Sequence, residues 1–314
     1  MLDLNQVNNG LTVTKLRTNF LRLIYDVFQH INVYDSILTD GGIEMKVCQF
    51  PKTIIGVLLL APWTGYVVAG VVGSQHDLTA GGGAQGQSAN TDEVCVFCHT
   101  PHGSDVNAPV PLWNKVLGTP GSYTQYSTLQ TPSFDSTEAP VGSVSLACLS
   151  CHDGTQAMDV VINLPGSGGY NVAGAQTDPV ALGVMTGTPV PMLGTDLTDD
   201  HPISMQYGGG GPSAADADGT FTGTLGDPDF NAPVKATVNT NPIWWVDSPV
   251  GTVGTRQKSD MILYARNDLG TVQPFVECGS CHDPHNDTTQ SATSVAFLRI
   301  DNTASQICTT CHTK

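Results

Sequence analysis

Cysteine and histidine recur along the chain in a pattern that could carry redox chemistry. Eight of the nine cysteines form four pairs, and a histidine directly follows each pair. The four C-x-x-C-H motifs are Cys95-Cys98-His99, Cys148-Cys151-His152, Cys278-Cys281-His282 and Cys308-Cys311-His312. This pattern is typical of c-type haem attachment, in which two thiols form thioethers and the adjacent histidine reaches the iron. We therefore expect four covalently bound haem c groups.

Zinc ribbons and disulfides are the competing interpretations of paired cysteines. An exported protein could form disulfides, and C-x-x-C pairs also bind zinc. Neither site requires a histidine after every pair, whereas haem attachment does. The sequence therefore favours haem.

The remaining histidines match the number of open axial positions. Beyond residue 74, four histidines lie outside the motifs: His76, His102, His201 and His285. Four irons have eight axial positions, so eight histidines would saturate them, and we predict bis-histidine ligation at every haem. Methionine is the competing sixth ligand and would raise the reduction potentials. The available methionines are Met158, Met185, Met192, Met205 and Met261.

Histidine spacing indicates how the distal ligands are shared. His102 follows His99 by three residues, and His285 follows His282 by three. On a helix such side chains lie on one side, so they cannot occupy opposite faces of one iron. We therefore expect each second histidine to serve a neighbouring haem. His76 precedes a glycine-rich stretch that could fold back or reach another subunit.

The elements that must position these residues are predicted to be short. The chain has 34 glycines and 20 prolines, and only 13% of its residues are charged. Short helices are predicted at the motifs, with candidate caps at Asn90 or Thr91, Ser143 and Asn302. Segments 261–266 and 271–277 read as a β-hairpin. The predicted fold is mostly coil with short helices at the haem motifs and a small β-hairpin, a multihaem cytochrome c wrapped around a chain of haems.

The first part of the chain reads as an export signal. Residues 45–74 combine a basic start with an apolar run that ends in small residues, which favours a secretory signal peptide over a membrane anchor. Residues 1–44 precede this signal and are interpreted as mis-assigned upstream translation. The tetrahaem cytochrome domain is expected at 75–314, with no membrane span after the signal is removed.

Charge limits the classes of partner. The formal net charge is −16, which is the wrong sign for neutralising phosphates, so nucleic acid is excluded as a partner. Cationic carriers or oxidised metal ions would be attracted instead. The acidic segments 216–219 and 227–229 could suggest calcium, but solvated turns are the favoured interpretation.

The motifs together resemble the doubled C-x-x-C-H cytochromes, and within them the OmcE-type tetrahaem extracellular cytochromes that polymerise into nanowire filaments. The matching segments are 76–78, 95–103, 278–285 and 297–312. The resemblance implies a continuous line of bis-histidine haems, a head-to-tail homopolymer, and a distal histidine supplied by the neighbouring subunit, for which His76 is the candidate. It also implies a secreted, extracellular or cell-surface location, with redox cytochromes and extracellular electron acceptors as partners.

Electron transfer without bond chemistry is therefore the expected function, and the chain is not expected to be an enzyme. An iron with two histidine ligands has no open position for a substrate. A monomeric periplasmic shuttle is the main alternative. A multihaem reductase is the other, and it would need one iron without its second ligand, for example through a free His201 or His76.

Overall fold

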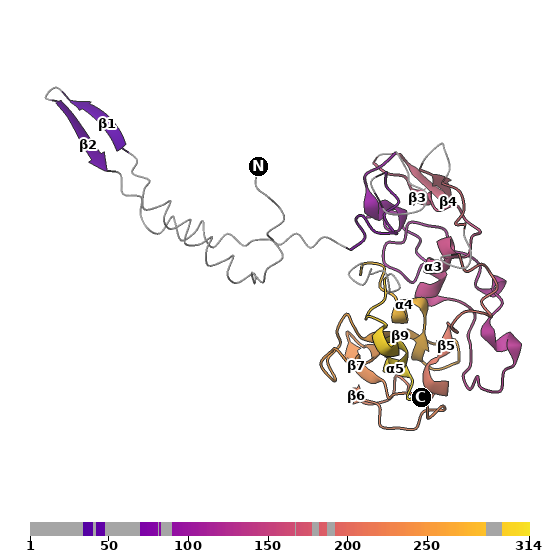
Figure 1. The fold of residues 1–314 in the computed structure, drawn as a ribbon. Helices are drawn as coiled ribbons and strands as arrows, with labels where there is room; N and C mark the ends of the chain where they lie inside the picture. The colour runs from indigo at the N-terminus through magenta and orange to yellow at the C-terminus, as the bar shows by residue number, and fades with distance from the viewer. Residues whose placement is uncertain are drawn as a thin grey trace. The chain divides into compact units, whose positions relative to one another are not determined.

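The fold was analysed in a computed structural model of the chain (Figure 1). The structure describes residues 34–39, 42–47, 70–80, 82, 90–166, 168–177, 182–186, 192–286 and 297–314. The chain divides into two compact units, residues 1–66 and 67–314. In the first unit, strands β1 (Tyr34–Thr39) and β2 (Gly42–Val47) form an antiparallel hairpin. Strand β2 crosses the expected boundary between the upstream segment, which ends at residue 44, and the signal peptide, which begins at residue 45. Most of the expected signal peptide lies outside the described residues.

The second unit is built on an antiparallel sheet of six strands, in the order β5-β10-β9-β8-β7-β6. Its strands are β5 (Met205–Gln206), β6 (Gly219–Thr220), β7 (Val234–Val238), β8 (Asn241–Val246), β9 (Met261–Arg266) and β10 (Gln273–Val276). The predicted hairpin is present as β9 and β10, with Arg266 opposite Gln273. The sequence predicted only this hairpin, whereas the sheet also contains a second one, formed by β7 and β8, in which β8 pairs with β9.

A separate two-stranded sheet lies closer to the first motif in sequence. It pairs β3 (Val160–Asn163) with β4 (Tyr170–Gln176) in antiparallel register. Val161 and Ile162 are buried, whereas most of β4 is exposed. Both sheets therefore lie within segment 153–277.

The helices are short, and four of them (η2, α3, α4 and α5) coincide with the cysteine motifs. The helical elements are η2 (Val94–Phe97), η3 (Pro120–Ser122), η4 (Tyr126–Leu129), α3 (Ser143–His152), η5 (Tyr207–Gly209), α4 (Cys278–Cys281), η6 (Thr303–Ser305) and α5 (Gln306–Cys311). The expected cap at Ser143 is wrong, since Ser143 is the first helical residue and Gly142 is the N-cap. Asn302 is the N-cap of η6 but makes no capping hydrogen bond through its side chain.

Apolar side chains form two buried clusters in the second unit. The larger one packs strands β5, β8, β9 and β10 around Trp244, Tyr207 and Met261. Cys281 and Cys311 pack against its edge, so two of the motifs lie beside this core. The smaller cluster surrounds α3 through Leu146 and Leu149. Among the described residues, no helix is both long and apolar enough to cross a membrane.

Candidate haem-binding site

Each motif places its two cysteines on one turn of backbone. The second, third and fourth motifs lie on α3, α4 and α5, and the first lies on the 3₁₀ turn η2 and the residue that follows it. In the first, third and fourth motifs the histidine N–H donates to the carbonyl of the first cysteine, at 2.8 to 3.0 Å. Residues three apart on such a turn project to the same side. Both thiols of each motif are therefore presented together.

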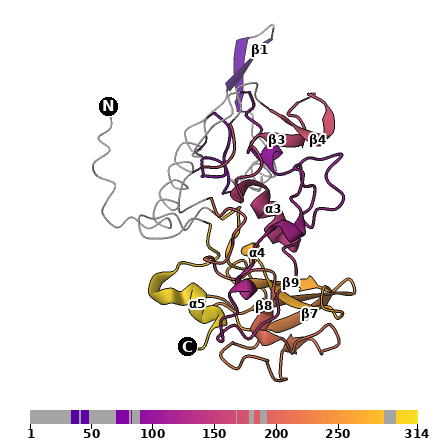
Figure 2. The same cartoon turned by 90° about the vertical axis from the view of Figure 1, so that its right-hand side faces the viewer.

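The four motifs lie next to one another in the order of the sequence. In both views of the second unit, α4 lies between α3 and α5 (Figures 1 and 2). The thiols that interact across motifs are Cys98 with Cys151, Cys148 with Cys278, and Cys281 with Cys311. The anchoring positions therefore form a continuous row.

Six of the eight motif cysteines are half-buried. Burial raises the pKa of Cys98 to about 12 and that of Cys281 to about 11, with smaller contributions from neighbouring thiols. A hydrogen bond with Cys278, together with burial, raises the pKa of Cys148. Cys95 and Cys308 are exposed. The row is therefore enclosed at its centre, and its first and last cysteines are open to solvent.

The structure brings predicted histidine ligands together in pairs, three of which are close ring pairs. The ring centroids of His76 and His152 and those of His99 and His285 are 6.2 Å apart, and those of His201 and His312 are 6.5 Å apart. Two imidazoles on opposite sides of one metal ion have centroids about 6 Å apart, given a metal–nitrogen bond of about 2.0 Å. Each pair combines one motif histidine with one histidine outside the motifs, as bis-histidine ligation requires.

Hydrogen bonds at Nδ1 orient several of these rings. His99 Nδ1 lies 2.9 Å from the Pro111 carbonyl oxygen, and His201 Nδ1 lies 3.0 Å from that of Pro202. His285 Nδ1 lies 3.4 Å from a carboxylate oxygen of Asp283. A protonated Nδ1 that donates to such an acceptor leaves Nε2 with a free lone pair for a metal. These contacts are the second shell that an iron-binding histidine requires.

His76 lies in a buried site of its own chain. Its ring stacks on Phe297 with a centroid distance of 4.1 Å. Burial, followed by the neighbouring His152, lowers the pKa of His76 to about 4, so the imidazole is in the neutral form that binds metals. In this single chain His76 therefore lies at His152, and its supply by a neighbouring subunit stays a prediction.

His201 was the least supported ligand in the sequence, because two aspartates directly precede it. The structure places it beside His312 in a cavity of about 340 Å³ that is also lined by Phe230, Asp227 and Asp229. Burial and the proximity of His201 lower the pKa of His312. The aspartates of the loop therefore do not prevent His201 from lying at a motif histidine.

His102 and His282, the two remaining predicted ligands, are exposed, and His102 lies three residues beyond His99. Because His285 of the third motif lies at His99 of the first, these two motifs are close in space. His102 therefore projects from the segment that already faces the third motif.

The alternative ligands and metals have less support from the geometry. Met205 and Met261 are buried within the larger apolar cluster. Two carboxylates of the candidate calcium segments are in ion pairs, Asp218 with Lys235 and Asp229 with Lys314. Within the described ranges, no group of three or more His, Cys, Asp or Glu side chains could hold a bare metal ion.

Two buried polar atoms near the histidine pairs bear on whether the site suits haem. Trp113 Nε1 and His76 Nδ1 are among the seven buried side-chain polar atoms that lack a hydrogen-bond partner in the part of the chain that the structure describes. Trp113 lies edge-on to His99, with ring centroids 6.1 Å apart. Buried donors of this kind normally have a partner. Their position at two histidine pairs fits a polar group bound there, such as a haem carboxylate.

Several residues that position the motifs were missed in the sequence. Asn114 is fully buried, and its amide group bonds the Val96 carbonyl and the backbone of Asn163. Lys115 is also fully buried, and its ammonium group donates to the carbonyls of 157, 158 and 160. In the sequence, Asn114 and Lys115 are only two polar residues after Trp113. Nothing in that pattern indicates the distant carbonyl groups that they bind.

Comparison with known proteins identifies part of the chain. The family model for the doubled CXXCH motif matches residues 273–314, which contain the third and fourth motifs. No curated protein matches the chain. The CXXCH motifs indicate covalently bound haem c. Together with the match, they support a multihaem c-type cytochrome family for this chain, with a role in electron transfer.

Proposed function

We propose that the chain is a tetrahaem electron-transfer cytochrome in which two histidines ligate every iron. The observation that carries this proposal is the spacing of the three histidine pairs, at 6.2, 6.2 and 6.5 Å between ring centroids. When bound, each haem supplies an iron that cycles between the ferric and ferrous states. The chain contributes axial ligands, burial and fixed spacing.

Ligand sharing between motifs is part of this proposal. His285 of the third motif lies at His99 of the first, so the third motif would supply the distal ligand of the first haem. His102, three residues beyond His99, would then be available to serve a neighbouring haem.

Ligand sharing between motifs supports electron transfer and argues against a reductase. A reductase needs an iron with an open position, which would arise if His76 or His201 did not ligate. Each of these histidines instead lies at a motif histidine. With every axial position filled, the chain would transfer electrons and not bind a substrate at iron.

A head-to-tail filament, secreted to the cell surface or beyond, is the assembly we propose. The net charge of −16 supports contact with cationic redox partners or oxidised metal ions. Head-to-tail contacts are heterologous and propagate into filaments instead of closing. A periplasmic monomer has one observation in its favour, because His76 lies at His152 of the same chain and a single chain then holds its own ligands.

The test of ligation uses the purified holoprotein. Mass spectrometry should give four haems per chain, and the resting ferric protein should be fully low-spin and should not bind cyanide. His285→Met should convert one haem to His/Met ligation and raise its potential. Fewer than four haems, or a high-spin signal at rest, would contradict the proposal. Electron microscopy of the extracellular fraction distinguishes filaments from monomers.

A further inference from the structure

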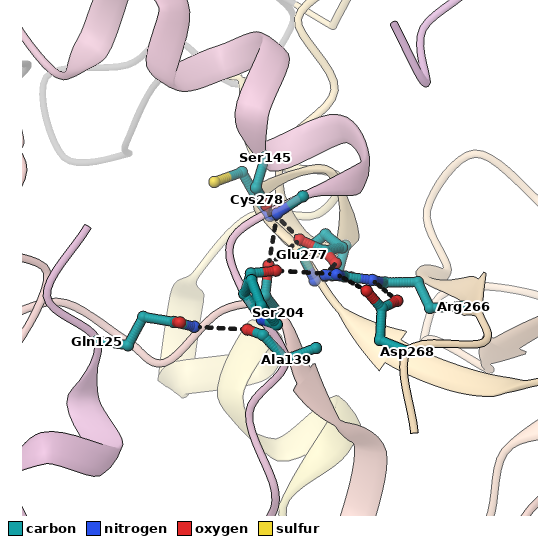
Figure 3. A network of polar contacts seen from close by, with 11 residues as sticks. Gln125, Ala139, Ser145, Ser204, Arg266, Asp268, Glu277 and Cys278 are labelled. Carbon is teal, nitrogen blue, oxygen red and sulfur yellow. Dashed lines mark hydrogen bonds and ion pairs between the residues drawn. The ribbon is translucent and has the colours of Figure 1, made fainter. Parts of the chain in front are cut away.

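A buried ionic network lies between the second and third motifs (Figure 3). Its centre is Glu277, whose side chain is 0% exposed, and its cation is Arg266, at 7%. Arg266 Nη1 donates to Glu277 Oε1 at 2.8 Å, and its other nitrogens donate to Asp268 at 2.8 and 3.0 Å. Ser145 and Ser204 donate to Glu277 Oε2 at 2.5 and 3.0 Å. We call these five residues the Glu277 network.

The network joins helix α3 to the start of helix α4. The backbone N–H of Cys278 donates to Ser145 Oγ at 2.9 Å, although the two residues are 133 positions apart. Ser145 in turn donates to Glu277, so one hydroxyl on the second motif's helix binds both residues at the start of the third motif. Figure 3 shows this hydroxyl at the junction of the two segments.

The segment before α3 is held by the same network. Arg266 Nη2 donates to the Pro140 carbonyl at 2.9 Å, and the Gly142 N–H donates to Ser204 Oγ at 3.3 Å. The contacts of Arg266 therefore bind the entry to α3 and the entry to α4 at once. Strands β9 and β10, which carry Arg266 and lead into Glu277, provide the rigid support.

The chemistry of this network suits a positioning role. Hydrogen bonds to ionised groups are short and directional, and a fully satisfied buried network specifies one arrangement of its members. Burial raises the pKa of Glu277, while contacts with Ser145, Arg266 and Ser204 act in the opposite direction. An apolar contact at this place would permit sliding of α3 against α4, because dispersion is not directional.

The network lies directly beside two anchoring cysteines of different motifs. The thiols of Cys148 and Cys278 are within hydrogen-bonding contact. Each of these thiols belongs to a different haem under the proposed function. The position of α3 relative to α4 therefore decides how the second and third haems stand relative to each other.

We propose that the Glu277 network is a positioning device that sets the separation and tilt of the haems anchored at Cys148 and Cys278, and thereby the rate of electron transfer between them. This inference rests on the proposed tetrahaem function. The members of the network are positioning residues, since they contact the anchoring segments and no reacting group.

The test compares two serines of the same helix. Ser145 links α3 to α4, whereas Ser150 is equally buried and bonds only the Ala147 carbonyl of its own helix. Ser145→Ala and Ser150→Ala would be prepared as holoproteins and checked for four haems each. Circular dichroism in the Soret band reports the relative orientation of neighbouring porphyrins. Photoreduction followed in time reports the rate of transfer between haems.

Ser145→Ala is expected to keep four haems, to change the Soret dichroism and to slow the interhaem step severalfold, while Ser150→Ala matches the wild type. Should Ser145→Ala fail to fold, Ser204→Ala leaves the sequence of α3 unchanged. It removes one donor from Glu277 and the acceptor of the Gly142 N–H, and it is expected to give a smaller change of the same kind. If the network variant and the Ser150→Ala control gave the same Soret dichroism and the same rate of interhaem transfer, the inference would be overturned. Fewer than four haems in the wild type would instead overturn the proposed function.

Discussion

Arg266→Met is the perturbation whose cost can be worked out most directly from the structure. The substitution keeps the apolar stem but removes the guanidinium, and with it the ion pairs to Glu277 and Asp268 and the bond to the Pro140 carbonyl. Glu277 then remains as a buried charge with two serine donors. Breaking one partner out of a buried pair costs about 3–5 kcal/mol. For a domain of this size, that corresponds to a melting temperature lowered on the order of 10 °C.

The assay is denaturant unfolding of the holoprotein, with a second substitution and a pH series. Arg266→Met/Glu277→Gln removes the stranded charge and should recover about half of the loss. The pKa of Glu277 is already raised by burial and rises further without the guanidinium. A carboxyl with a raised folded-state pKa destabilises the fold increasingly as pH rises from its unfolded-state pKa, about 4.3, to the folded-state value. The deficit of Arg266→Met should therefore shrink as pH falls through the raised pKa toward about 4.3.

The control for this prediction is an exposed ion pair. Lys314 contacts Asp229 at 2.6 Å, but its side chain is 76% exposed, so Lys314→Ala should leave unfolding unchanged. If Arg266→Met were no less stable than Lys314→Ala, or if its deficit grew toward acidic pH, the assignment of Glu277 as a buried charged partner would be refuted.

Three further substitutions follow from individual contacts. Asn114→Ala leaves the Val96 carbonyl without its buried donor and should cost about 1–3 kcal/mol in unfolding free energy, measured by denaturant titration. Gly279→Ala places a methyl group against the Tyr264 hydroxyl and should lower the unfolding free energy by about 1–3 kcal/mol. Adding Tyr264→Phe should recover part of this loss, and a double variant no more stable than Gly279→Ala would contradict the clash. Lys115→Met removes a buried cation that acts electrostatically on Cys98, so spectroelectrochemistry should show a lower potential for the haem anchored there, with an unchanged potential as the contradicting result.

The sequence was most informative where the interactions are local. The C-x-x-C-H spacing indicated which segments turn, and these segments are helical turns in the structure. The hairpin of β9 and β10 was predicted because its turn and alternating side chains lie within one short segment. Both features depend on residues a few positions apart, and such residues interact whatever the rest of the chain does.

Features that join distant segments could not be derived in this way. Strands β5 and β6 have two residues each, too few for a periodic signal, and they are strands only because longer neighbours supply partners. The position of His76 depends on Phe297, more than two hundred residues later. In the sequence, Ser145 and Glu277 look like an ordinary serine and an ordinary carboxylate, and their burial appears only once α3 meets α4.

The separation of 133 residues between Ser145 and Cys278 has a consequence for biogenesis. At about 5–20 residues per second, the ribosome needs about 7 to 27 seconds to produce the second half of this contact after the first. During that interval the helix of the second motif lacks its docking surface, and contacts so distant in sequence also form slowly. Helix α3 can therefore take its place against α4 only after most of the second unit has been synthesised.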